Sequence, residues 1–155
     1  MKLPRSKLDG PTQTGQVVAM GYSHTPQGAI LAAIRGQAHL ALAADNAWGK
    51  TLAVVSAPGP GRDEFAAARI ALSIEGDLPK GRTHRFVAFK VNHYSEHSAA
   101  IVVAAEIGTP AITFAQPVAL SWLAGDWRIV LPTAAENITA TEVTSLDGYT
   151  RLEQP

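Results

Sequence analysis

The first clear pattern in the chain is a run of apolar residues at helical spacing after residue 25. Thr25 can cap a helix through its hydroxyl, and Pro26 suits the first helical position because an N–H there would have no intrahelical partner. The helix should end near Asp45-Asn46, and Trp48 should fold back onto it. The apolar pattern consists of Leu31, Ile34, Ala38, Ala41 and Leu42, flanked by Ile30, while Arg35 and His39 fall on another face.

A second helix is predicted over residues 62–75. It follows the stretch 56–61 (SAPGPG), whose prolines and glycines argue against regular structure. Gly76 provides a C-terminal stop. The predicted apolar stripe is Phe65, Ala68 and Leu72, with Ala66, Ile70 and Ile74 beside it.

From residue 85 onward the apolar positions follow the patterns of strands. Alternation or continuous apolar runs predict strands at 85–94, 99–107, 116–123 and 127–131, the last two joined by a hairpin at Ala124-Gly125-Asp126. Pro132 ends the last strand. The first strand should carry Val87, Phe89 and Val91 on one face.

This order of elements predicts an α+β fold with the helices packed on one face of a curved antiparallel sheet. We expect three parts: an extended lead-in at 1–24, a single α+β domain at 25–132, and a C-terminal tail at 133–155 that docks on the domain. The docking residues of the tail should be Leu146, Tyr149 and Leu152. Such a sheet with helices across its concave face forms a cone, and we expect Trp48, Trp122 and Trp127 to fill it.

Composition narrows the range of functions. Hydrophobic residues make up 46% of the 155 residues, which is ordinary for one globular domain. Thirteen basic side chains balance thirteen acidic ones, so the chain lacks the long-range field that would attract a phosphate backbone. Cysteine is absent, which excludes disulfides, thiolate zinc sites and cysteine nucleophiles. No run of about 18 apolar residues is present to span a membrane.

Two groups of residues are candidates for chemistry. The stretch 93–97 (HYSEH) holds two histidines and a carboxylate, which suits zinc, but no third ligand stands at a recognisable interval. An acid–base pocket inside the cone would need a desolvated ionisable group, and the candidates are Asp45, His93, Tyr94 and Glu106. No pair among them is clearly aimed at a shared point. We therefore assign no catalytic, cofactor-binding or metal-binding residue and expect no cofactor.

Several short motifs together resemble one family. They are LPRSK at 3–7 with DGP at 9–11, GYSHTPQGA at 21–29, GDWRIVLP at 125–132 and SLDGY at 145–149. The pattern is similar to that of small actinobacterial membrane-anchored proteins encoded in integrative conjugative elements. The resemblance implies a cone-shaped nuclear-transport-factor-2-like (cystatin-like) fold, similar to the periplasmic domain of the inner-membrane assembly factor of type IV secretion systems.

The resemblance also implies a function. In such proteins a transmembrane helix precedes the first motif, so the native chain is expected to continue upstream of Leu3 and to lie on the extracytoplasmic face of the cell membrane. The domain would be a non-catalytic assembly part of a conjugative DNA-transfer apparatus. It would contact other proteins of the machinery, form oligomers, and bind no nucleic acid directly.

The alternative from another class is a small-molecule isomerase, cyclase or dehydratase, or a ligand-binding protein, that uses the cone as its pocket. An open chamber in which Glu106 or Asp45 faces a tyrosine or histidine would favour this alternative.

Overall fold

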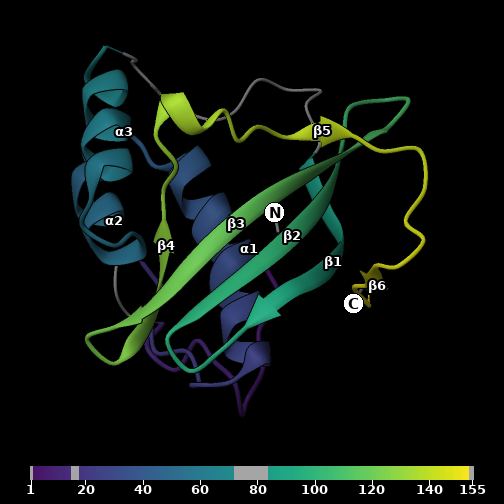
Figure 1. Ribbon diagram of the computed structural model, residues 1–155, viewed down its shortest axis with the longest axis horizontal. Helices are drawn as coiled ribbons and strands as arrows, with labels where there is room; N and C mark the ends of the chain where they lie inside the picture. Colours follow the sequence, from purple (N-terminus) through teal and green to yellow (C-terminus); the bar gives the residue numbers. More distant parts are fainter. Residues whose placement is uncertain (1, 15–17, 72–83, 154–155) are drawn as a thin grey trace.

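A six-stranded antiparallel sheet carries three helices on one of its faces (Figure 1). The computed structural model describes residues 2–14, 18–71 and 84–153. The strand order is β4-β3-β2-β1-β6, and β5 pairs with β3 beyond the end of β4. The elements are α1 Pro26–Leu42, α2 Trp48–Val55, α3 Pro60–Ile70, β1 His84–Tyr94, β2 Ser98–Ile107, β3 Ile112–Leu123, β4 Asp126–Val130, the 3₁₀ turn η1 Ala134–Glu136, β5 Thr141–Glu142 and β6 Thr150–Arg151.

Helix α1 begins as the sequence predicts. The Thr25 hydroxyl accepts the Gly28 N–H at 3.1 Å, and Pro26 occupies the first turn. The helix ends at Leu42, three residues before the predicted end at Asp45. Its fully buried residues, among them Ile34, pack against the sheet in one apolar core. The sheet contributes Ile101, Val103, Val118, Leu120, Trp127 and Ile129 to this core.

Helix α2 is absent from the sequence prediction, which had Trp48 only folding back. It has eight residues and no side-chain N-cap. Arginines from other elements hold its last carbonyls instead: Arg128 Nη1 donates to Val54 O at 2.7 Å, and Arg62 Nη2 donates to Ala53 O at 3.0 Å. Cations at a helix C-terminus interact favourably with its unpaired carbonyls.

Helix α3 begins at Pro60, so the prediction that 56–61 is irregular throughout is wrong. Proline is well suited to the first turn of a helix. Gly61 fits there because a Cβ at this position would lie 1.8 Å from the carbonyl oxygen of Leu131. The helix buries Arg69 and leaves Ala68 exposed, contrary to the predicted stripe. Leu72, Ile74 and the predicted stop at Gly76 lie outside the described residues.

A β-bulge changes which residues of β1 face the helices. Phe86 pairs with Ala105 and Ala88 pairs with Ala104, so Val87 is the extra residue. Phe86 and Phe89 pack against the main core, whereas Val87 joins a second cluster on the opposite face. The prediction of one face shared by Val87, Phe89 and Val91 is therefore wrong. The inserted residue interrupts the alternation of side chains between the two faces of the sheet.

Strand β3 begins at Ile112, four residues earlier than predicted, and ends in a two-residue turn. Leu123 pairs with Asp126 across Ala124 and Gly125, whose φ values are 53° and 77°. Two positive φ angles are those of a type I′ turn, which matches the twist of antiparallel strands. The predicted hairpin is present, and Asp126 is the first residue of β4.

Segments near both ends of the chain pack against the sheet or the main core. Val18 and Tyr22, in the predicted lead-in, are buried in the main core, so this segment belongs to the folded unit. In the tail, Leu146 and Tyr149 pack on Val87, Ala88 and Ala104, on the face of the sheet opposite the helices. The tail then reaches the free edge of β1 through β6 (Figure 1).

Within the described parts of the chain, no helix combines the length and the apolar character needed to cross a membrane.

Candidate functional site

The face of the sheet opposite the helices, here called the outer face, contains a gap along one edge of β3. Strand β4 pairs with residues 119–123, and β5 pairs with Phe114 and Ala115. Residues 116–118 lie between these partners, and no strand in the described part of the chain pairs with them on this side. The chain leaves the sheet after Val130, passes through η1 and returns as β5 (Figure 1).

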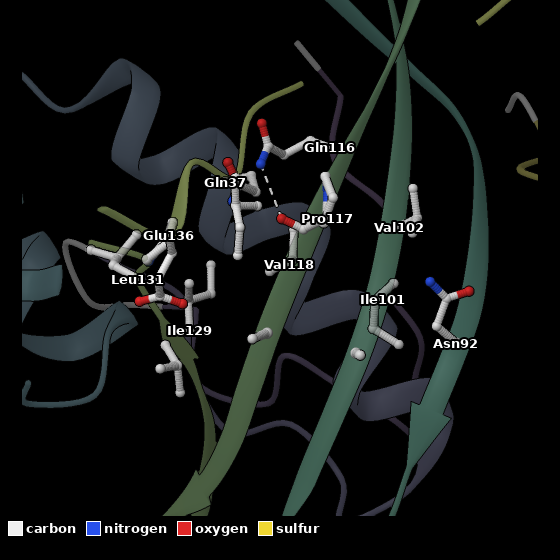
Figure 2. A pocket seen from close by; sticks show the side chains of 15 residues that line it. Gln37, Asn92, Ile101, Val102, Gln116, Pro117, Val118, Ile129, Leu131 and Glu136 are labelled. Atoms are coloured by element: carbon white, nitrogen blue, oxygen red, sulfur yellow. Dashed lines mark hydrogen bonds between the residues drawn. The ribbon is translucent and has the colours of Figure 1, made fainter. Parts of the chain in front are cut away.

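Pro117 makes this gap stable without a partner strand. In β3, the Trp122 N–H points toward β2, and the Thr113 carbonyl points toward β5. Successive residues of a strand direct their backbone groups to opposite sides, so those of Pro117 point toward the gap. Proline has no N–H to leave unpaired. Its carbonyl accepts a hydrogen bond from the side-chain amide of Gln116 at 3.0 Å (Figure 2). The gap is therefore built into the local sequence.

An apolar groove of about 260 Å³ lies over the gap (Figure 2). Its floor is formed by residues of β2, β3 and β4 together with Gln37 of α1, and its wall by the segment that follows β4. Val130 and Ile138 are each 41% exposed, which is high for aliphatic side chains in contact with the body. The lining of the groove includes Val102, Pro117, Ala119, Val130, Glu136 and Ile138.

Glu136 is the charged residue among those that line the groove. Its Oε1 accepts from the Thr133 N–H at 3.0 Å and from the Thr133 hydroxyl at 3.2 Å, which completes the capping box of η1. Within the described residues, no hydrogen bond reaches Oε2. Figure 2 shows the carboxylate extending from the η1 turn toward β4. The groove thus combines an apolar floor with one carboxylate oxygen that has no protein donor.

A second hollow, here called the inner hollow, lies on the helix side of the sheet and has a volume of about 210 Å³. It lies between the C-terminal half of α1 and the sheet, with Leu42, Phe86 and Phe114 in its wall. Gln37 and Gln116 line both hollows, so the two lie on either side of the gap in the sheet. The inner hollow has no carboxylate among its described lining residues.

Trp127 belongs to the main core, and Trp48 and Trp122 pack against it, so all three tryptophans contribute to the core as expected. None of them lines the inner hollow or the outer groove. Trp127 is 3% exposed, and Trp122 stacks on His24 with 3.9 Å between ring centroids. Trp48 lies under the guanidinium of Arg69, 5.8 Å from ring to charge. The cone is therefore not filled completely: the inner hollow stays open, with Phe86 and Phe114 in its wall.

A buried carboxylate fastens the N-terminal segment to the sheet. Asp126 accepts backbone N–H groups from Gly21 at 2.8 Å, Tyr22 at 3.0 Å and Trp127 at 2.9 Å. We call Gly21, Tyr22 and Asp126 the N-terminal clasp. Burial raises the pKa of the Tyr22 phenol to about 12, against the lowering effect of Arg35.

The clasp is bordered by Arg35 and His39 of α1. Arg35 Nη1 donates to the carbonyl of Pro4 at 3.1 Å, and the Nε2 of His39 is buried with no hydrogen-bond partner among the described residues. Burial lowers the pKa of His39, and the charge of Arg35 lowers it further. The hollow that Tyr22, His39 and Asp126 share is only about 10 Å³, roughly room for one water molecule. This cluster therefore holds the fold together and has no room for a substrate.

A family model described as a domain of unknown function (DUF8175) matches residues 1–151. The chain belongs to the DUF8175 family. Comparisons with curated proteins and with solved structures return no match.

The DUF8175 domain does not bring the predicted acid–base residues together. Glu106 lies on the outer face and forms an ion pair with Arg85. Asp45 pairs with Arg69 at 3.0 Å, near the C-terminal end of α1. None of the four candidates, Asp45, His93, Tyr94 and Glu106, lines the inner hollow.

The histidine-rich stretch lies at the turn between β1 and β2. His93 Nε2 is 3.4 Å from the Ser98 hydroxyl, and His97 is exposed. Tyr94 donates its hydroxyl to the carbonyl of His24 at 3.3 Å. In the described part of the DUF8175 domain, no three His, Asp or Glu side chains are grouped as metal ligands would be.

Sequence reasoning missed the outer groove and the clasp. One signal was present: a proline inside the strand pattern marks a position without a ladder hydrogen bond, and Pro117 is such a residue. Glu136 and Asp126 gave no comparable signal, because their roles depend on segments far away in the sequence.

Proposed function

We propose that this domain is a non-catalytic assembly part of a bacterial conjugative DNA-transfer apparatus of the type IV secretion kind, and that it docks other proteins of the machinery through its outer groove. The observation that carries the proposal is the apolar groove over the gap in β3. Exposed apolar surface with a polar rim is typical of protein–protein contact sites.

Two further features support this role. The helices on one face of an open antiparallel sheet are compatible with the cone of a nuclear-transport-factor-2-like fold, which we propose as the finer classification. The motifs that resemble the conjugation family also meet in space: the Asp9 carboxylate accepts from Ser23, and Asp126 accepts from Gly21 and Tyr22. A membrane anchor before Leu3, as that family has, would thus be joined to the domain through the clasp.

The test is a transfer assay in a host in which the gene is deleted and then supplied as the full-length chain. Ala119→Arg places a long charged side chain on the exposed floor of the groove. Ala68→Arg makes the same change on the exposed face of α3. We expect Ala119→Arg to lower transfer frequency at least tenfold at normal protein level, and Ala68→Arg to leave it unchanged. Normal transfer after gene deletion, or with Ala119→Arg, would contradict the proposal.

A second candidate is a ligand-binding protein or a small-molecule isomerase, cyclase or dehydratase. The inner hollow favours it, because two amide side chains, Gln37 and Gln116, border an apolar space. The test is methyl NMR of the isolated domain with a set of small apolar amides and ketones. Saturable shifts of Leu42 and Ile107, with none at Ile138, would support ligand binding on the helix side.

A further inference from the structure

We infer that the outer groove binds a partner segment in which an apolar side chain is followed by a lysine or arginine, the cation pairing with Oε2 of Glu136. This inference rests on the proposed function for the surface involved. It adds the chemistry of the occupant, which the proposed function leaves open.

The groove recognises side chains and does not accept an added strand. A peptide that extends a sheet needs alternating backbone donors and acceptors on the edge it joins. At the gap, Pro117 offers no N–H, and its carbonyl is already bonded to the amide of Gln116. The backbone of a bound segment can therefore form few hydrogen bonds here, and its affinity must come from the contacts of its side chains.

The size of the groove fits side chains. Its volume of about 260 Å³ is a little below the range of roughly 300–1,000 Å³ for pockets that hold drug-sized ligands or cofactors. Val102, Ala119, Val130 and Ile138 supply an aliphatic surface. One or two aliphatic side chains of a partner would cover Val130 and Ile138, which are otherwise partly exposed to water.

The negative charge in the groove favours an occupant with a positive charge. Glu136 is the ionised group among the lining residues, and its Oε1 is held in place by the capping box. The carboxylate is thus positioned before binding, with Oε2 free of protein donors in the described residues. A cation at the end of an aliphatic chain matches this arrangement, whereas an anion would be repelled.

The experiment uses three small probes with the same six-carbon chain: n-hexylammonium, n-hexanol and hexanoate. Binding to the whole domain is followed through the methyl signals of Val102, Val130 and Ile138. We expect hexylammonium to bind two- to fivefold more tightly than hexanol, the range of a solvent-exposed ion pair, and hexanoate to bind more weakly than both. Added salt should reduce the preference.

Glu136→Gln is the matched variant. Glutamine keeps the acceptor that the capping box requires, so η1 should stay folded. The variant should bind hexylammonium and hexanol equally. Glu142→Gln, an exposed change on β5 outside the groove lining, should keep the preference.

Several outcomes would overturn the inference. They are equal binding of the three probes to the unchanged domain, shifts confined to the inner hollow, and methyl shifts that depend on protein concentration without any probe, which would assign the groove to a second copy of the chain. The transfer assay is independent of these results. A groove that prefers the cation while Ala119→Arg transfers normally would refute the proposed function and leave the groove chemistry standing.

Discussion

At the scale of single residues, the charged side chains that matter most are those that bond to backbone. Asp126 accepts three N–H groups, Glu136 caps η1, and Arg128 holds the end of α2. Each side chain joins segments that are distant in sequence or closes a turn. Charge in this domain serves mainly to position the chain.

Replacing Asp126 by asparagine should lower the free energy of unfolding by about 1.5–3 kcal/mol, because hydrogen bonds to a charged acceptor are lost and an amide donor faces N–H groups. Urea denaturation measures the change. Asp147→Asn is the control, since Asp147 is exposed, and should change stability by less than about 0.5 kcal/mol. Equal effects of the two substitutions would refute the role given to the clasp.

The half-buried His39 should make stability depend on pH. Its pKa in the folded chain is below the ordinary value of 6.5, so the unfolded chain takes up a proton at a higher pH than the folded chain does. The free energy of unfolding should therefore fall as the pH drops below 6.5. His39→Gln should flatten this part of the profile, measured by urea midpoints from pH 7.5 to 5, while the exposed His97→Gln should not.

At the scale of elements, the helices and strands differ in how far sequence determines them. Helix α1 was predictable because Thr25 and Pro26 mark its start through purely local chemistry. Helix α2 was not, because it has no side-chain cap and depends on Arg62 and Arg128 from other elements. The bulge at Val87 was also hidden, since the pattern of alternation does not show where one residue is inserted.

The candidate site, too, was only partly visible in the sequence. The outer groove arises because two short strands share one edge of β3, which is a property of pairing and of the path after Val130. Only Pro117 pointed to it from the sequence. The carboxylates predicted for the cone, Asp45 and Glu106, instead form ion pairs with Arg69 and Arg85, which periodicity could not indicate.

Two glycines in helices should respond in opposite ways to alanine. Gly61→Ala should destabilise the domain by about 2 kcal/mol or more, because the new Cβ would overlap the backbone of Leu131. Gly49→Ala in α2 should stabilise it by about 0.5–1 kcal/mol, since no described atom outside the adjoining residues and the helix backbone lies within 4 Å of the added Cβ. Thermal unfolding of the pair measures both. A Gly61→Ala variant as stable as the parent would show that α3 is not seated against residues 131–132.

At the scale of the whole molecule, the two ends of the chain are attached with different strength. The N-terminal segment enters the main core through Val18 and Tyr22. The tail holds a smaller cluster through Leu146 and Tyr149, reaches the main core only through the partly buried Leu152, and has strands β5 and β6 of two residues each. We expect the tail to open locally while the rest stays folded.

Hydrogen exchange tests this expectation. The double change Leu146→Ser and Tyr149→Ser should raise the exchange rate of the Leu152 amide, which donates to Val87 O, by about tenfold or more. The Trp122 amide of β3, which donates to the carbonyl of His97 just before β2, should keep its protection. Equal acceleration at both amides would mean that the tail and the sheet unfold as one unit.

The clasp also determines how the domain responds to mechanical load. Tension on the N-terminal segment reaches the sheet at the start of β4, where the N–H groups of Gly21 and Tyr22 share the Asp126 carboxylate and must separate from it together. Tension on the C-terminal end meets β6 first and β5 next, and these two-residue pairings separate one after the other, as in a zipper. The domain is thus stiff when drawn from one end and compliant when drawn from the other.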